Sequence, residues 1–136
     1  MNSTKETFLP SLDYIAGVVE TSGSFFWVKS GKKENPVFHI KLIGKERAIL
    51  ELISQKLGLG GGVYEYLHGG RHYALLIVRK RSVIERVIIP TFDQRLLGTK
   101  KIQFEAWRDR FNRQQLAKIT DVSQETIVSS PLEIEN

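Results

Sequence analysis

The sequence predicts an α+β domain in which four antiparallel strands form one sheet with helices on one of its faces. Residues 37–43 alternate apolar and polar side chains, the pattern of a strand that is buried on one side only. Residues 45–57 repeat apolar residues at helical spacing. Helix-like and strand-like segments follow one another in the order α-β-β-α-β-β-α-α. This order favours two hairpins in one sheet whose second face is open to solvent.

The first helix is expected to begin after Pro10 and to end near Gly23. Ser11 or Asp13 can cap its first amides, and glycine is a usual residue at the C-terminal end of a helix. Ala16-Gly17 stands in mid-helix, where glycine costs about 1 kcal/mol relative to alanine. A glycine at this point indicates that another backbone comes very close.

Two hairpins are expected next along the chain. Residues 24–30 are aromatic and β-branched, which favours a strand, and the charged segment 31–36 reads as a turn leading to the strand at 37–43. Residues 63–67 and 71–78 form the second predicted hairpin. The glycine run between the second helix and this hairpin is not a phosphate-binding loop, because no Lys-Ser/Thr follows it.

Two helices are expected after the second hairpin. The first spans residues 81–89 and is closed by Pro90. The second runs from Leu96 to about Lys118, with basic residues on much of its surface. Its predicted apolar side consists of Ile102, Phe104, Trp107, Phe111 and Leu116.

Length and composition are those of one globular domain. The chain has 136 residues, of which 41% are hydrophobic and 26% charged, with no apolar run near the length of about 18 residues that a membrane span needs. There is no cysteine and no signal-peptide pattern, so we expect an intracellular, reducing compartment such as a bacterial cytoplasm or an organelle.

Charge is divided unevenly along the chain. All 20 Lys and Arg residues lie before Ile119 together with 11 acidic ones, so residues 1–118 carry about +9 and residues 119–136 about −4. A basic body favours a polyanionic partner, most simply nucleic acid. We therefore expect a single domain over residues 1–118 and a loosely attached acidic tail over 119–136.

The first helix also resembles a known motif. Ile15-Ala16-Gly17-Val18-Val19-Glu20-Thr21-Ser22-Gly23 is similar to the nine-residue signature of the LAGLIDADG homing endonucleases, and Ser24-Phe25-Phe26 resembles the start of that family's first strand. The resemblance implies the αββαββα family fold, with a saddle-shaped sheet over DNA. It also implies that two such helices pack side by side. With one motif per chain, a homodimer is expected, with Ile15, Ala16, Gly17, Val19 and Gly23 at the interface.

The resemblance continues beyond the motif helix. Pro90-Thr91-Phe92 and Leu97-Gly98-Thr99-Lys100-Lys101-Ile102-Gln103-Phe104 are similar to the Pro-x-Phe and Leu-x-x-Lys-Lys-x-x-Phe patterns that the family often has. In relatives a lysine here sits near the scissile phosphate. Lys100 or Lys101 matches it, and the sequence does not choose between them.

Alternation of side chains names the residues expected to face a duplex if the sheet is a saddle. Lysine and arginine suit phosphates, and the other types can meet base edges or a thymine methyl. The three histidines lack a Cys or Asp partner pattern, so we expect no metal site among them. The predicted contacts are Ser24, Phe26, Val28, Ser30, Lys32, His39, Lys41, Tyr64, Tyr66, His68, Arg71 and His72.

The catalytic part of the resemblance is broken at one residue. In the family the eighth letter of the motif is an acid that binds a divalent metal, with Mg²⁺ the cofactor that the resemblance implies. Here that position is Ser22. A neutral hydroxyl is a poor Mg²⁺ ligand compared with a carboxylate. Glu20, at the sixth letter, lies about 200° around the helix from Ser22, so it cannot occupy the same place.

Three interpretations follow from the resemblance. The first is an intron-encoded protein that binds a long, roughly palindromic double-stranded DNA site as a homodimer, with cleavage impaired by Ser22. The second is a splicing cofactor for group I intron RNA (a maturase), a role known in the family. The third is an active site-specific DNA endonuclease that uses another ligand or a partner chain's acid.

Overall fold

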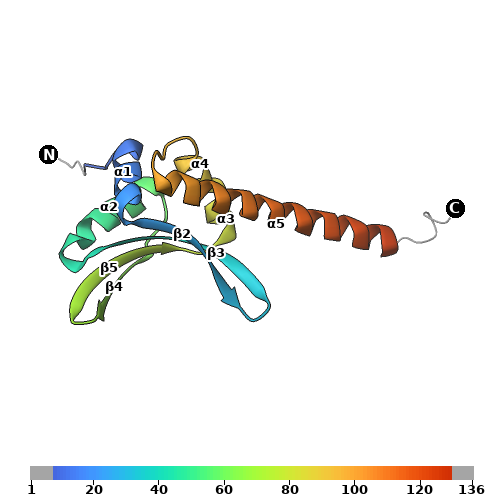
Figure 1. The fold of residues 1–136 in the computed structure, drawn as a ribbon, viewed down its shortest axis with the longest axis horizontal. Coiled ribbons are helices and arrows are strands. Elements are labelled where there is room, and N and C mark those ends of the chain that lie inside the picture. Colours follow the sequence, from blue (N-terminus) through green and yellow to red (C-terminus); the bar gives the residue numbers. More distant parts are fainter. Residues whose placement is uncertain (1–7, 130–136) are drawn as a thin grey trace.

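The computed structural model describes residues 8–129, with one four-stranded antiparallel sheet at its centre (Figure 1). The helices lie on the convex side of this sheet, and the concave side is open (Figure 1). The predicted α+β class and the open sheet are confirmed. The strands are β2 (Gly23–Ser30), β3 (Lys33–Ile43), β4 (Val63–His68) and β5 (Arg71–Val78), in the order β2-β3-β5-β4.

The helical segments connect and cover the two hairpins. The motif helix is α1 (Leu12–Ser22), and Ser11 caps it by accepting a hydrogen bond from the Tyr14 amide. A 3₁₀ turn, η1 (Gly44–Glu46), leads into α2 (Arg47–Leu57). After the second hairpin come α3 (Arg81–Val83), the π-helical turn η2 (Ile84–Ile88), α4 (Ile89–Phe92) and the long α5 (Thr99–Ser129).

Tight turns close both hairpins. Gly69 and Gly70 link β4 to β5 with φ values of 59° and 78°, a conformation that side-chain-bearing residues rarely adopt. The first hairpin turns at Gly31-Lys32, so the predicted turn 31–36 is too long and β3 begins at Lys33. Pro36 is accepted within β3 because β5 pairs with β3 only from Phe38 onward, which leaves a single neighbouring strand at Pro36.

The helix expected to stop before Pro90 continues to Phe92. Proline cannot donate the amide hydrogen that an α-helix interior needs. The wider π-helical turn at Ile84–Ile88 immediately precedes it and lets the chain pass this residue as a helix. As a result Phe92 reaches the core, where it is fully buried.

The last helix also differs from the prediction of residues 96–118, because α5 begins at Thr99 and ends at Ser129, projecting past the sheet (Figure 1). Phe104, Trp107 and Phe111 are buried as predicted, but Ile102 and Leu116 are exposed. Ile102 lies about 200° around the helix from Phe104, and Leu116 about 140° from Phe111.

Of the predicted tail, residues 130–136 lie outside the described residues. Within the described part, no helix is long and apolar enough to cross a membrane.

The core is built around Phe25, the first inward-facing side chain of β2. Its ring centroid lies 5.2 Å from that of Phe38, 5.8 Å from Phe92, 5.1 Å from Phe104 and 5.0 Å from Trp107. These rings come from β2, β3, α4 and α5, so one aromatic cluster holds the sheet to two of its covering helices. Such ring pairs contribute beyond the area they bury.

Three side chains of α5 bond to the free edge of β2. Lys100 Nζ donates to the Gly23 carbonyl at 2.6 Å, the Phe25 amide donates to Gln103 Oε1 at 3.0 Å, and Trp107 Nε1 donates to the Phe26 carbonyl at 3.0 Å. An edge strand otherwise presents unpaired backbone groups. The helix therefore takes the place of a fifth strand along the first half of β2.

We expect Phe25→Ala to lower the free energy of unfolding by about 3–5 kcal/mol, because it removes the central ring of the cluster and leaves a cavity. The matched control is Ile102→Ala, whose side chain is 70% exposed and should cost less than about 0.5 kcal/mol. Urea unfolding of the three proteins measures the difference. Equal losses for both variants would contradict the assignment of the core.

Candidate nucleic-acid interface

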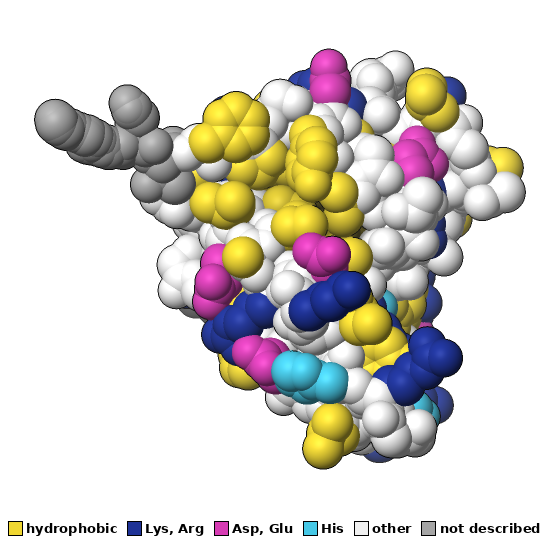
Figure 2. Space-filling view, turned by 90° about the vertical axis from the view of Figure 1, so that its left-hand side faces the viewer, with side chains coloured by type: hydrophobic (Ala, Val, Ile, Leu, Met, Phe, Trp, Pro, Cys, Tyr) yellow, Lys and Arg dark blue, Asp and Glu magenta, His cyan; other side chains and the backbone are white. Residues whose placement is uncertain are grey.

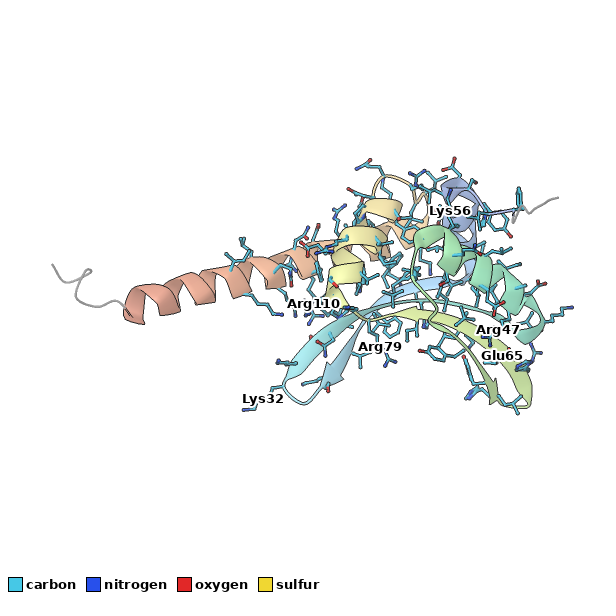
Figure 3. All side chains as sticks on the ribbon, turned by 180° about the vertical axis from the view of Figure 1, so that it is seen from behind. Lys32, Arg47, Lys56, Glu65, Arg79 and Arg110 are labelled. Atoms are coloured by element: carbon cyan, nitrogen blue, oxygen red, sulfur yellow. The ribbon has the colours of Figure 1, made fainter. Side chains whose placement is uncertain are left out.

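The concave side of the sheet carries most of the residues predicted to face a duplex. Because Phe25, Ile40, Ala74 and Leu76 point into the core, their neighbours on each strand point the opposite way. Lys32 sits at the tip of the first hairpin (Figure 3). The predicted residues that the register places on the concave side are Ser24, Phe26, Val28, Ser30, His39, Lys41, Tyr64, Tyr66, His68 and Arg71.

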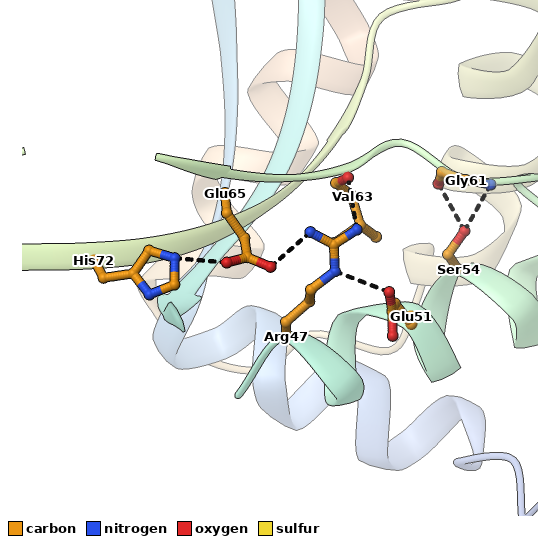
Figure 4. Close-up of polar contacts among 7 residues, drawn as sticks. All are labelled: Arg47, Glu51, Ser54, Gly61, Val63, Glu65 and His72. Carbon is orange, nitrogen blue, oxygen red and sulfur yellow. Dashed lines mark hydrogen bonds and ion pairs between the residues drawn. The ribbon is translucent and has the colours of Figure 1, made fainter. Parts of the chain in front are cut away.

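His72 was predicted on the concave side, and the structure places it on the convex one. Arg71 and His72 are consecutive strand residues, so they cannot share a face. The His72 Nε2 atom lies 2.6 Å from Glu65 Oε1, and Arg47 Nη1 lies 2.8 Å from the other Glu65 oxygen (Figure 4). The Arg47 guanidinium, followed by His72, holds the pKa of the Glu65 carboxyl below its ordinary value. His72 thus links β5, β4 and α2.

Several concave-side residues were missed by the sequence analysis. Strict alternation along β5 from Arg71 predicts Tyr73, Leu75 and Ile77 on the concave side and excludes His72 from it. Arg79, just past β5, lies beside the same concave side (Figure 3). The missed strand residues are Lys33, Asn35, Val37, Ile43, Tyr73, Leu75 and Ile77.

Acidic residues are absent from the concave side of the four strands. The strands contain two carboxylates, Glu34 and Glu65, and both point to the other side. Glu34 forms an ion pair with Arg110 of α5, and Glu65 forms one with Arg47 of α2. The positive charges on the concave side of the strands are therefore not neutralised by carboxylates of the strands. The two carboxylates instead attach helices to the other side of the sheet. A polyanion meets no like charge on these strands.

Lys100, and not Lys101, reaches the end of the motif helix. Its ammonium donates to the Gly23 carbonyl, directly after Ser22, whereas Lys101 is exposed on α5. His39 pairs with Ser24 in the sheet and therefore lies beside the end of the motif helix as well. Burial, and then the charges of Lys41 and Lys100, lower the pKa of His39 below its ordinary value and so favour its neutral form.

Glu20 is committed to the chain's own fold. Its carboxylate accepts hydrogen bonds from the amides of Leu97 and Gly98, in the loop that precedes α5. The Glu20 carboxylate is thus directed toward the start of α5. Glu20 thereby positions the loop from which Lys100 extends.

The residues at the end of α1 do not fit a divalent metal. Ser22 offers a hydroxyl 3.3 Å from that of Thr21, and the nearby Gly23 carbonyl is bonded to an ammonium. Hard cations such as Mg²⁺ prefer carboxylate oxygens, and the chain supplies none here. Among the described residues, no group of three or more His, Cys, Asp or Glu side chains could hold a metal ion, and this includes the three histidines.

Most residues predicted at a dimer interface belong to the chain's own core. Ile15, Ala16, Val19 and Gly23 are buried, because this face of α1 packs on the sheet. Of the predicted set only Gly17 is exposed. It lies on the opposite face of the helix, in an exposed or half-buried stripe with Tyr14, Val18 and Thr21.

An apolar surface adjoins this stripe. Figure 2 shows apolar side chains gathered on this face of the molecule, next to the N-terminal end. A groove of about 490 Å³ runs between the start of α1 and α2. It is lined mainly by Phe8, Leu9, Pro10, Tyr14, Ile49 and Leu52.

Comparison with known proteins places this geometry in a family. The family model described as "LAGLIDADG endonuclease" matches residues 15–111. A search of curated proteins finds no match. Among solved structures, the LAGLIDADG homing endonuclease I-GzeII in complex with its DNA target is 20% identical with a TM-score of 0.70, covering 96% of this chain and 43% of that chain.

Two further structures share the fold. I-SmaMI bound to cleaved DNA is 22% identical with a TM-score of 0.70, covering 86% of this chain and 41% of that one. I-TnaI is 21% identical with a TM-score of 0.67, covering 81% of this chain and 77% of that one. The chain thus spans less than half the length of I-GzeII and I-SmaMI. Since the family model matches most of the sequence, and the fold agrees, this chain belongs to the LAGLIDADG endonuclease family.

Proposed function

We propose that this protein binds double-stranded DNA across the concave side of its sheet, as a homodimer, and that it cuts DNA slowly or not at all. The observation that carries the proposal is the charge of that side: cationic residues line it, while both carboxylates of the strands lie on the other side in ion pairs. Phosphate contacts by Lys and Arg supply most of the affinity for a duplex. I-GzeII and I-SmaMI, which share the fold, were crystallised with DNA.

A second copy of the chain is the partner proposed for the exposed side of α1. A Cβ built on Gly17 would meet nothing within 4 Å, so the chain's own packing does not require glycine there. Close approach of a second backbone would require it. The neighbouring apolar groove extends the surface that a second copy could cover. A domain of this size is about 35 Å wide, so two copies side by side would span about 20 base pairs of a roughly palindromic site.

Impaired cleavage is proposed from the chemistry at the end of α1. Phosphodiester cleavage benefits from a metal that activates water and neutralises developing charge. Ser22, at the position of the family's acid, offers no charge to such a metal, Glu20 is held by loop amides, and the Lys100 ammonium already occupies the Gly23 carbonyl. A divalent cation would be repelled by this ammonium without any carboxylate to offset it.

Lys41→Ala should weaken binding to a mixed-sequence duplex and reduce the slope of log affinity against log salt by about one per subunit, because it removes a phosphate contact. Arg86→Ala, which removes a charge from the helix layer, is the control and should leave the slope unchanged. Titration at several salt concentrations measures both. An unaltered slope for Lys41→Ala would remove this residue from the interface. Tighter binding to group I intron RNA than to duplex DNA would favour the splicing-cofactor interpretation instead.

Gly17→Leu should convert the dimer to monomer at micromolar concentration, because the added side chain overpacks the proposed helix contact by several kcal/mol. The chain itself has room for a side chain at this position, so the melting temperature of the monomer should not fall. Ala117→Leu, an exposed substitution on α5, is the matched control. Sedimentation equilibrium decides the matter, and a monomeric unmodified protein at micromolar concentration would refute the dimer.

Ser22→Asp should introduce at least some Mg²⁺-dependent cleavage of a bound duplex, because it supplies one carboxylate per subunit at the end of α1. Ser22→Asn has nearly the same size without the charge and should remain inactive. A time course of duplex cleavage with Mg²⁺ or Mn²⁺ compares the three proteins. Rapid double-strand cleavage by the unmodified chain would show that the metal is bound elsewhere or by other groups.

A further inference from the structure

The concave side of the sheet carries several apolar side chains, although no helix covers it. Phe26 and Val28 on β2, Ile43 on β3, and Leu75 and Ile77 on β5 all point to this side. Val28 is 41% exposed and Ile43 47%, although both are aliphatic. Tyr64, Tyr66 and Tyr73 extend the same surface. Apolar side chains gathered on an uncovered sheet face indicate a site of interaction.

These side chains are not needed by the core. The aromatic cluster and the rest of the core cluster lie between the sheet and the helices, so these concave side chains point away from that core. Polar side chains lie among the apolar ones, with Ser24, His39 and Lys41 in the middle of the sheet. Further cationic or polar residues stand at the two hairpin tips, with Lys32 and Lys33 at one and His68 and Arg71 at the other. The concave side thus combines aliphatic and polar side chains between its tips with a cationic group at each tip.

The base edges of a duplex offer one apolar group, the 5-methyl of thymine, which projects into the major groove. Reading cytosine favours a carboxylate that accepts from its amino group, and the concave side of the strands has none. Reading guanine favours arginine or lysine, which stand mainly at the tips. This inference rests on the proposed function: we propose that the aliphatic side chains of the concave side read thymine methyl groups, so that each half-site is rich in A·T pairs between its ends.

The aromatic rings of this side argue for a duplex and against a single strand. Tyr66 and Tyr73 pack on each other with centroids 5.6 Å apart, Lys41 Nζ lies 4.3 Å from the Tyr73 ring centroid, and the ring of Phe26 meets that of His39 at 4.9 Å. A single-strand reader presents free ring faces on which bases stack. Here neighbouring side chains pack against the rings of Phe26, Tyr66 and Tyr73, while the aliphatic Val28 and Ile43 stay exposed for small apolar contacts.

Selection of the full-length protein against a library of random duplexes identifies the bound sequence directly. We expect the selected half-sites to be A·T-rich in their interior. Replacing interior thymines one at a time by deoxyuridine, which lacks only the methyl, should weaken binding about fourfold for each buried methyl. The same replacement outside the site is the control for general effects on the duplex.

Protein variants connect this loss to the concave side. Val28→Ser should abolish the sensitivity to uridine at one position of each half-site and leave the others, whereas Ile102→Ser on α5 should change nothing. G·C-rich selected sites, or affinities that ignore the methyl group, would overturn the methyl readout while leaving duplex binding intact. Failure to enrich any duplex, with binding to single-stranded RNA instead, would overturn the proposed function and the methyl readout together.

Discussion

The junction between α1 and β2 governs the orientation of the whole sheet. The helix ends at Ser22 and the strand begins at the next residue, so the chain turns at Gly23 within a single residue. A Cβ at Gly23 would lie 2.7 Å from Val19 Cγ1, a distance that side chains do not tolerate. Glycine is needed here for close approach and not for a left-handed conformation, since its φ is −95°. The turn directs Phe25 into the core and Ser24 and Phe26 outward.

Backbone pairing then transmits the inward and outward orientation of the β2 side chains to the neighbouring strands. Ser24 pairs with His39, His39 with Ile77, and Lys41 with Leu75, so one inward residue determines which side chains of the neighbouring strands face outward. A slip of one residue would exchange the two faces of a strand. The aromatic cluster around Phe25 opposes such a slip, because it would turn Phe25 out of contact with the covering helices.

The long helix α5 links this framework to the corner where the family places its chemistry. Lys100, Gln103 and Trp107 follow one another at helical spacing and bond successive groups along the β2 edge. Glu20 holds the loop before α5, so α1 and α5 position each other. The corner is therefore built for a precise arrangement even though Ser22 lacks the carboxylate.

Local pattern in the sequence determined the element types, both hairpins, the α+β class and the resemblance of Ile15–Gly23 to its family, because alternation, helical spacing and turn residues act over a few residues.

Tertiary structure decided which face of each element is buried. The sequence predicted a dimer contact through Ile15 and Val19 of the motif helix. In the structure that face of the helix packs on the sheet, and Gly17 is exposed on the opposite face. His72 and Ile102 were misplaced for the same reason: the phase of a strand or helix is defined by its packing partners. The selection of Lys100 over Lys101, the capture of Glu20 by loop amides and the passage of the chain beyond Pro90 also depend on contacts between segments far apart in sequence, which local pattern does not encode.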